Sequence, residues 1–292
     1  MAKWKKFFAA ICGLTLITTA SFAAENDNRQ SELNADEIEY DTESGVAKAN
    51  GSVTAKSVQN KEPSELNADN VEYNMNSGIV TATGNVLLKH GTGKATGTHA
   101  MYNSKTMEAY ITGNVIVERD GIKITCNSMR SDGAGHMQAD GNVHGTQIVQ
   151  PNEKYPNGDT RTFTGEHVDY YPDDKKHVVI PHGGLITMND GTFTADYMEG
   201  WLDEEHYIGT GNAHATNPPR QMEAGGDQAD YYGKENGKLI LTGNAWAIQE
   251  NNTVRGNRLT VYLEDDKLKV KPESQKFSEP AIDKTFEGGS KN

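Results

Sequence analysis

The sequence has few of the residues that would indicate disulfide or metal chemistry. Two of its 292 residues are cysteines, and one of them, Cys12, lies in an apolar segment near the N-terminus. Once that segment is removed, Cys126 has no partner for an intrachain disulfide. The nine histidines are scattered and show no His-Glu-x-x-His spacing, which is the pattern of a helical zinc site. These absences predict no metal and no cofactor, and a fold held by sheet pairing and core packing alone.

Positive charge is also scarce. The chain has 28 Lys and Arg residues against 41 Asp and Glu residues, a formal net charge of −13. This balance argues against binding to nucleic acid and against electrostatic docking on anionic lipid headgroups. Any lipid ligand would be bound mainly by burial of its acyl chains.

One apolar run of some length occurs, at residues 7–20 (FFAAICGLTLITTA). It follows MAKWKK and precedes Ser21-Phe22-Ala23, so residues 1–23 are predicted to be a secretory signal peptide cleaved after Ala23. The alternative is an uncleaved inner-membrane anchor, for which the run is short, because a span needs about 20 apolar residues. Cleavage would remove three of the 28 basic residues and leave 25 against 41 acidic ones, a net charge of −16.

A phrase of about twenty residues is repeated along the chain. Residues 33–53 read LNADEIEYDTESGVAKANGSV, and residues 66–86 read LNADNVEYNMNSGIVTATGNV. About eleven residues after each Tyr position comes a glycine, usually followed by Asn, as in GNV at 84–86, 113–115 and 141–143 and GNA at 211–213 and 243–245. Such recurrence is typical of a repeat architecture. The residues of a catalytic site, in contrast, usually occur only once in a chain.

Each copy predicts short β-strands. The alternation Ile38-x-Tyr40 is typical of a half-buried strand, and the β-branched run at residues 79–83 (IVTAT) predicts the returning strand. The Gly-Asn pair predicts a bend or bulge. The mature chain shows no helical period, so we predict an all-β protein. About sixteen strands exceed one flat sheet, and a β-solenoid or a long jelly roll would accommodate them.

The repeat unit A-D-x-apolar-x-Y, followed by G-N-V, resembles the OstA-like (LptA) family of periplasmic lipopolysaccharide transport proteins. The clearest stretches are residues 31–120 and 222–270, including LTGNA at 241–245 and VRGNRLTVY at 254–262. The resemblance implies an elongated open β-jelly roll of about eight stacked repeats over residues 31–270, in one domain or two. Residues 24–30 would be a linker, 150–160 (QPNEKYPNGDT) a loop insertion, and 271–292 a disordered polar tail.

The same resemblance implies a function. Such a protein would bind lipopolysaccharide, shield the acyl chains of lipid A in a hydrophobic groove, and bridge the inner and outer membranes for outer-membrane assembly. Exposing a chain of about a dozen carbons to water costs on the order of 10 kcal/mol. The implied partners are inner- and outer-membrane Lpt components with similar domains, and further copies stacked head to tail through edges near residues 33–40 and 259–263. No catalytic residue is expected.

The candidate groove residues are the inward positions of the repeats. They are Ile38, Tyr40, Val71, Tyr73, Val86, Leu88, Met101, Val115 and Val117. Three alternatives stay open: the same residues could fill a closed core, the chain could be an exported β-solenoid scaffold or adhesin, or it could be a glycan-active enzyme with two acids on adjacent repeats.

Overall fold

The computed structural model describes residues 31–59, 62–119, 121–153, 155–171, 174–233, 237–250, 252–263 and 269–272. The predicted signal peptide, the linker at 24–30 and residues 273–292 of the predicted tail lie outside these ranges, whereas residues 271–272 of that tail belong to a strand. Within them the chain forms strands and a single 3-10 turn, η1 (Pro218–Arg220), which confirms the all-β prediction. None of the described residues forms a helix with the length and apolarity that a membrane crossing requires.

The strands follow one another closely along the chain. The first ten are β1 (Ser31–Asn34), β2 (Glu37–Asp41), β3 (Val46–Gln59), β4 (Glu62–Asn74), β5 (Ile79–His90), β6 (Gly93–Asn103), β7 (Ala109–Arg119), β8 (Ile122–Ser131), β9 (Met137–Val149) and β10 (Asp159–Tyr171). The others are β11 (His177–Ile180), β12 (Gly184–Met188), β13 (Gly191–Ala195), β14 (Tyr197–Trp201), β15 (His206–Asn217), β16 (Met222–Tyr232), β17 (Lys238–Gln249), β18 (Asn252–Tyr262) and β19 (Lys269–Pro272).

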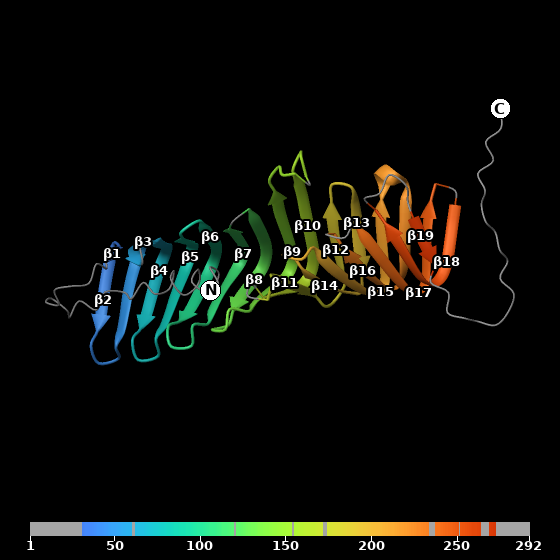
Figure 1. Ribbon diagram of the computed structural model, residues 1–292. Coiled ribbons are helices and arrows are strands. Elements are labelled where there is room, and N and C mark those ends of the chain that lie inside the picture. Colours follow the sequence, from blue (N-terminus) through green and yellow to red (C-terminus); the bar gives the residue numbers. More distant parts are fainter. Residues whose placement is uncertain are drawn as a thin grey trace, which may run out of the picture.

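All 19 strands belong to one antiparallel sheet with meander connectivity. From β3 to β10 and from β15 to β19, each strand pairs with the next one in the chain. At three places in the sheet, two short strands together take the place of one long strand and pair with the same neighbour. These are β1 and β2 beside β3, β11 and β12 beside β10, and β13 and β14 beside β15. The sheet is therefore long, with β1 and β2 at one end and β18 and β19 at the other (Figure 1).

Each long strand bends once, where the register of the ladder shifts. At Gly84 and Asn85 the backbone φ angles are +73° and +47°, a region that glycine and asparagine tolerate better than other residues. The Asn85 amide donates to both carboxylate oxygens of Asp69 on β4, each at 3.1 Å. Asn244 makes the same pair of bonds to Asp227. The Ala-Asp and Gly-Asn parts of the repeat thus meet across neighbouring strands and form the corner of the sheet.

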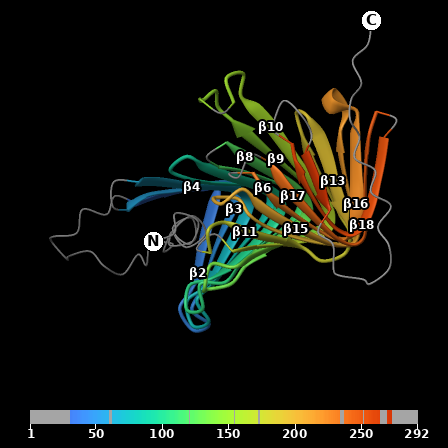
Figure 2. The ribbon, with the colours of Figure 1, turned by 45° about the vertical axis from the view of Figure 1, so that its right-hand side comes forward.

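The corners line up from strand to strand and divide the sheet lengthwise into two half-sheets. We call the half that contains β1, β12 and β13 the upper half-sheet, and the half that contains β2, β11 and β14 the lower half-sheet. Figure 2 shows strands diverging from this common line. The inner faces meet near the corner, because a Cβ added at Gly209 of the lower half-sheet would lie 2.5 Å from the Phe193 ring of the upper one. The result is the elongated open roll that the sequence predicts.

The core is a single thin layer between the half-sheets. Strand β5 shows the alternation, since Val80, Ala82, Val86 and Leu88 are buried while the residues between them are more exposed. The buried apolar residues form one continuous cluster from Ala49 on β3 to Val261 on β18. The interior is therefore a narrow apolar seam that runs the length of the roll.

Candidate functional site

Two adjacent cavities lie between the rims of the half-sheets in the C-terminal half of the roll. Their volumes are about 90 Å³ and about 60 Å³, and both are lined by Ile186, Met188 and Tyr207. Each is smaller than a cavity of about 150 Å³ that holds one benzene molecule. As the structure stands, a whole acyl chain would fit only if the two half-sheets moved apart.

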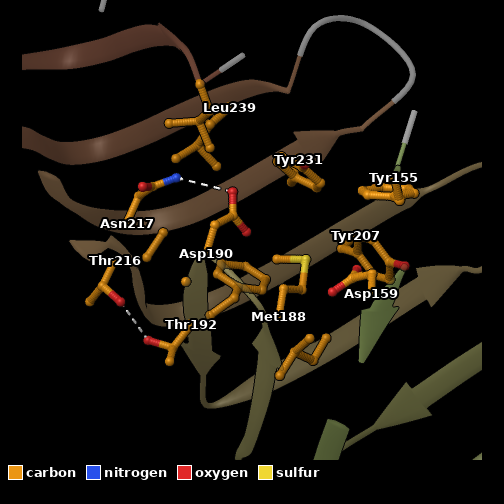
Figure 3. Close-up of a pocket in the computed structure, with 15 residues that line it drawn as sticks. Tyr155, Asp159, Met188, Asp190, Thr192, Tyr207, Thr216, Asn217, Tyr231 and Leu239 are labelled. Carbon is orange, nitrogen blue, oxygen red and sulfur yellow. Dashed lines mark hydrogen bonds between the residues drawn. The ribbon is translucent and has the colours of Figure 1, made fainter. Parts of the chain in front are cut away.

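The cavities are apolar inside because the strands alternate. Ile186 and Phe193 face the interior from β12 and β13, whereas Leu185 and Thr194 beside them point outward and are more exposed. From the lower half-sheet, Tyr207 on β15 joins them. Figure 3 shows the polar edge of the first cavity, where the Asn217 amide bonds the Asp190 carboxylate at 3.3 Å and the Thr192 and Thr216 hydroxyls are 2.8 Å apart.

The two rims of the groove differ in chemistry. Along the lower rim the ladder places in one row six tyrosines, which are Tyr40, Tyr73, Tyr102, Tyr170, Tyr207 and Tyr231. The facing upper rim carries smaller or charged polar residues, including Ser57, Ser64, His90, Gln147 and Arg161. An apolar floor between two polar rims suits an amphiphile, whose apolar part can be buried while its headgroup stays at the rim.

A buried cation lies at the mouth between the two cavities. The Arg161 side chain is 12% exposed, and its Nε lies 2.7 Å from Oδ2 of Asp159. Its Nη2 lies 3.8 Å from Oε1 of Glu205, and its guanidinium carbon is 5.1 Å from the centroid of the Tyr155 ring. Desolvation lowers the pKa of Arg161, but the hydrogen bond to Asp159 and the charges around it outweigh this effect, so the guanidinium stays charged. Burial raises the pKa of Tyr207, which also hydrogen-bonds Arg161.

The outer face of the lower half-sheet carries an ordered row of rings. His136, Tyr171, His177, Trp201, His206 and Tyr232 stack in succession, with neighbouring ring centroids 4.3 to 5.5 Å apart. In the sequence these histidines look scattered, because only the register of the strands brings residues such as His136 and Tyr171 together.

Beside this row, His167 lies between two carboxylates. Its Nδ1 is 2.5 Å from Asp140 and its Nε2 is 3.1 Å from Asp169. Desolvation lowers the pKa of His167, yet the two carboxylates outweigh it and the net shift is upward. For Asp169 desolvation raises the pKa, but bonds from Gln138, His136 and His167 lower it overall. Among the described residues, no three such side chains converge as a metal site would require.

Most of the candidate groove residues from the sequence are on the inner face of the N-terminal half. Five are buried, namely Val71, Val86, Leu88, Val115 and Val117, and Tyr73 is partly buried on the lower rim. Ile38 and Tyr40 are on the same face, opposite Ala49 and Ala47. They are 53% and 47% exposed because β2 is the terminal strand of the lower half-sheet.

Met101 does not face the groove. It is 39% exposed, whereas Ala100 and Tyr102 on either side of it are buried. In the repeat A-D-x-apolar-x-Y, Met101 occupies the position held by Glu39 and Glu72 in other copies, and side chains alternate between faces along a strand. The inward residues of this copy are therefore Ala100 and Tyr102.

The residues that line the cavities were not predicted from the sequence. Ile186, Met188 and Phe193 lie where the repeat is least regular, around His182-Gly183-Gly184. The alternation of apolar and polar residues in β12 (GLITM) and β13 (GTFTA) was the available signal. It identifies inward positions but not the places where the half-sheets stand apart.

The fold and the site define a class of protein, an elongated open antiparallel roll with an apolar interior between two polar rims. Residues 202–267 match the family described as "LptA/(LptD N-terminal domain) LPS transport protein". That segment is similar to this lipopolysaccharide transport family, in agreement with the resemblance seen in the sequence. It is a family of transport proteins, not of enzymes. The match includes residues 222–267 of the stretch that we expected and leaves 31–120 outside.

A solved structure also shows similarity. It is LptH, the LptA homologous periplasmic component of the lipopolysaccharide transport device of Pseudomonas aeruginosa, at 17% sequence identity and a TM-score of 0.36. The alignment covers 41% of this chain and 82% of that one. No curated protein matches the chain.

Proposed function

We propose that this protein is a periplasmic transport protein that binds lipopolysaccharide and shields the acyl chains of lipid A in its groove. One observation carries the proposal: a continuous apolar cluster, from Ala49 to Val261, lies between the half-sheets and beneath two polar rims. The family match to residues 202–267 supports the same substrate class. The candidate residues Val71, Val86, Leu88, Val115 and Val117 would form the floor of the N-terminal part.

Burial of acyl chains would supply the free energy of binding. A chain of about twelve carbons gains on the order of 10 kcal/mol when it leaves water, and this gain would offset the cost of separating the two half-sheets over a short length. The corner provides the axis for this motion, because its glycines occupy φ values near +70° to +85° at Gly84, Gly113 and Gly243. The roll would then open at its rims while the corner pairing is kept.

The ends of the roll suit assembly with similar domains. Among the described residues β2 pairs only with β3, so its other edge is available to a strand from a partner. At the other end β19 pairs only with residues 259–262 of β18. We propose that inner- and outer-membrane Lpt components, or further copies of this chain, add at these edges and bridge the two membranes. Ile38 and Tyr40 would continue the apolar floor into the partner.

Site-specific photo-crosslinking tests the proposal. A photoreactive residue at Ile186 should form an adduct with lipopolysaccharide, and one at the neighbouring outward position Leu185 should not. The pair Val115 and Asn114 tests the N-terminal half in the same way. Adducts at the inward positions alone would support the groove. Equal labelling of inward and outward positions, or none in the folded protein, would contradict it and favour a filled scaffold.

A further inference from the structure

We propose that Arg161 binds an anionic group of the lipid headgroup, such as a phosphate, in exchange for Glu205, and that this exchange unlocks the groove. The inference rests on the proposed function and adds a headgroup contact to it. The acidic composition of the chain predicted binding mainly by burial of acyl chains. The inward-facing cation at the mouth adds a charge contact that composition does not reveal.

The contacts of Arg161 tie the two rims together. On the upper side, Asp159 and Arg161 belong to β10, and Tyr155 belongs to the loop before it. On the lower side, Glu205 is in the turn before β15, and Tyr207 is on β15 itself. We call these five residues the mouth clasp. Figure 3 shows Tyr155, Asp159 and Tyr207 grouped at one end of the first cavity. For the half-sheets to part here, the contact between Arg161 and Glu205 must break.

The two carboxylates hold Arg161 differently. Asp159 is within direct hydrogen-bond distance of Nε at 2.7 Å and is on the same strand. Glu205 is 3.8 Å from Nη2, beyond the 3.5 Å of a hydrogen bond. Asp159 therefore orients the guanidinium, and Glu205 forms an ion pair with Nη2 that is longer than a hydrogen bond. A phosphate can bond the guanidinium edge that carries Nη2 through two parallel N–H groups, so the exchange replaces a long contact with a bidentate one.

The position of the clasp matches the shape of an acylated ligand. Tyr207 lines both cavities, Asp159 lines the first and Arg161 lines the second, so the clasp stands between them. A headgroup above Arg161 could direct one acyl chain to each side. Because a ligand shifts a conformational equilibrium only through contacts that differ between the two states, the headgroup contact made on release of Glu205 would couple binding to opening.

Two amphiphiles with the same chain test the proposal. We would measure the dissociation constants of dodecyl phosphate and of nonionic dodecyl maltoside, below their micelle concentrations, and take their ratio as the preference for the anion. R161Q should lower this preference about tenfold, the effect of about one charge-assisted hydrogen bond. E205Q should raise the preference by removing the competing carboxylate. E204Q is the matched control, because Glu204 is in the same turn but pairs with Lys175 at 2.6 Å.

The outcomes separate this inference from the proposed function. Opposite shifts in R161Q and E205Q, with E204Q unchanged, would support the clasp; a structural defect would weaken both amphiphiles in both variants. If every variant binds both amphiphiles with the preference of the wild type, Arg161 is not the headgroup contact, although the lipid-binding groove stands. If the wild type binds neither amphiphile, the proposed function fails together with the inference.

Discussion

Replacing a corner glycine tests how the repeat folds the sheet. In Gly243→Ala the new Cβ would lie 2.3 Å from Oδ2 of Asp227 and 2.9 Å from its Cβ. The φ angle of +71° at this position adds backbone strain for any residue with a side chain. A steric conflict and backbone strain therefore both act at this residue. A second glycine that has only the backbone strain allows the two effects to be measured separately.

Gly91, in the turn between β5 and β6, is the control. Its φ is also positive, at +53°, but a Cβ there meets nothing within 4 Å. Gly91→Ala should therefore show backbone strain alone, about 1–2 kcal/mol. Gly243→Ala adds a steric conflict of about 1–3 kcal/mol, which gives a total loss of about 2–5 kcal/mol. Adding Asp227→Ala removes the closest atom, so the double variant should be more stable than the sum of the single losses predicts.

Urea unfolding followed by circular dichroism measures each free energy of unfolding. The expected order of stability is wild type, then Gly91→Ala, then Gly243→Ala. If Gly243→Ala loses no more than Gly91→Ala, the Asp227 side chain does not restrict the corner. If Asp227→Ala fails to offset the loss, the conflict lies elsewhere. Either result would refute the role given to the Asp and Gly-Asn pair.

Three further predictions follow from the groove, the outer face and the thiol. Phe193→Ala should lower the free energy of unfolding by about 3–5 kcal/mol, because the ring is 5% exposed, whereas Thr194→Ala on the outer face should change it by about 0.5 kcal/mol or less in urea titrations. The raised pKa of His167 stabilises the fold below about pH 6.5, an effect lost as pH rises through the folded value, and the lowered pKa of Asp169 stabilises it above about pH 4, an effect lost on acidification. The stability that His167→Asn removes should therefore be largest near pH 5 in unfolding curves recorded from pH 3 to 9, and a flat profile would contradict the pairing. Burial raises the pKa of the Cys126 thiol to about 11, so a disulfide reagent at pH 8 should label it only after unfolding, and fast labelling of the folded protein would show that β8 is accessible.

The sequence was informative wherever the repeat is regular. The alternation of Val71 and Tyr73 predicted their common face, and Gly84-Asn85 predicted the bulge, because both features depend on local backbone geometry. The partner of that bulge, Asp69, is 15 residues before Gly84 in the sequence and is brought to it by strand pairing. The sequence therefore shows that an Ala-Asp pair recurs, but it does not show that the Asp side chain contacts the bulge.

Features that depend on the separation or register of distant strands could not be predicted. Arg161 and Glu205 are 44 positions apart in sequence, and they meet only because the sheet folds at its corner. The ring stack from His136 to Tyr232 likewise needs the register of successive strands. The prediction for Met101 was wrong for a simpler reason. Side chains alternate between the two faces of a strand, so an error of one residue assigns a side chain to the wrong face.

The meander connectivity has a consequence for how the protein forms. Nearly every strand pairs with its immediate neighbours in the chain, as β4 does with β3 and β5, so the sequence distance between bonded residues is short throughout. Such local topology favours rapid folding and allows structure to start at any hairpin and spread in both directions. A chain that emerges progressively during its synthesis can therefore add strands in the order in which they appear. A roll built this way can also gain or lose a hairpin in evolution and become longer or shorter without a new fold.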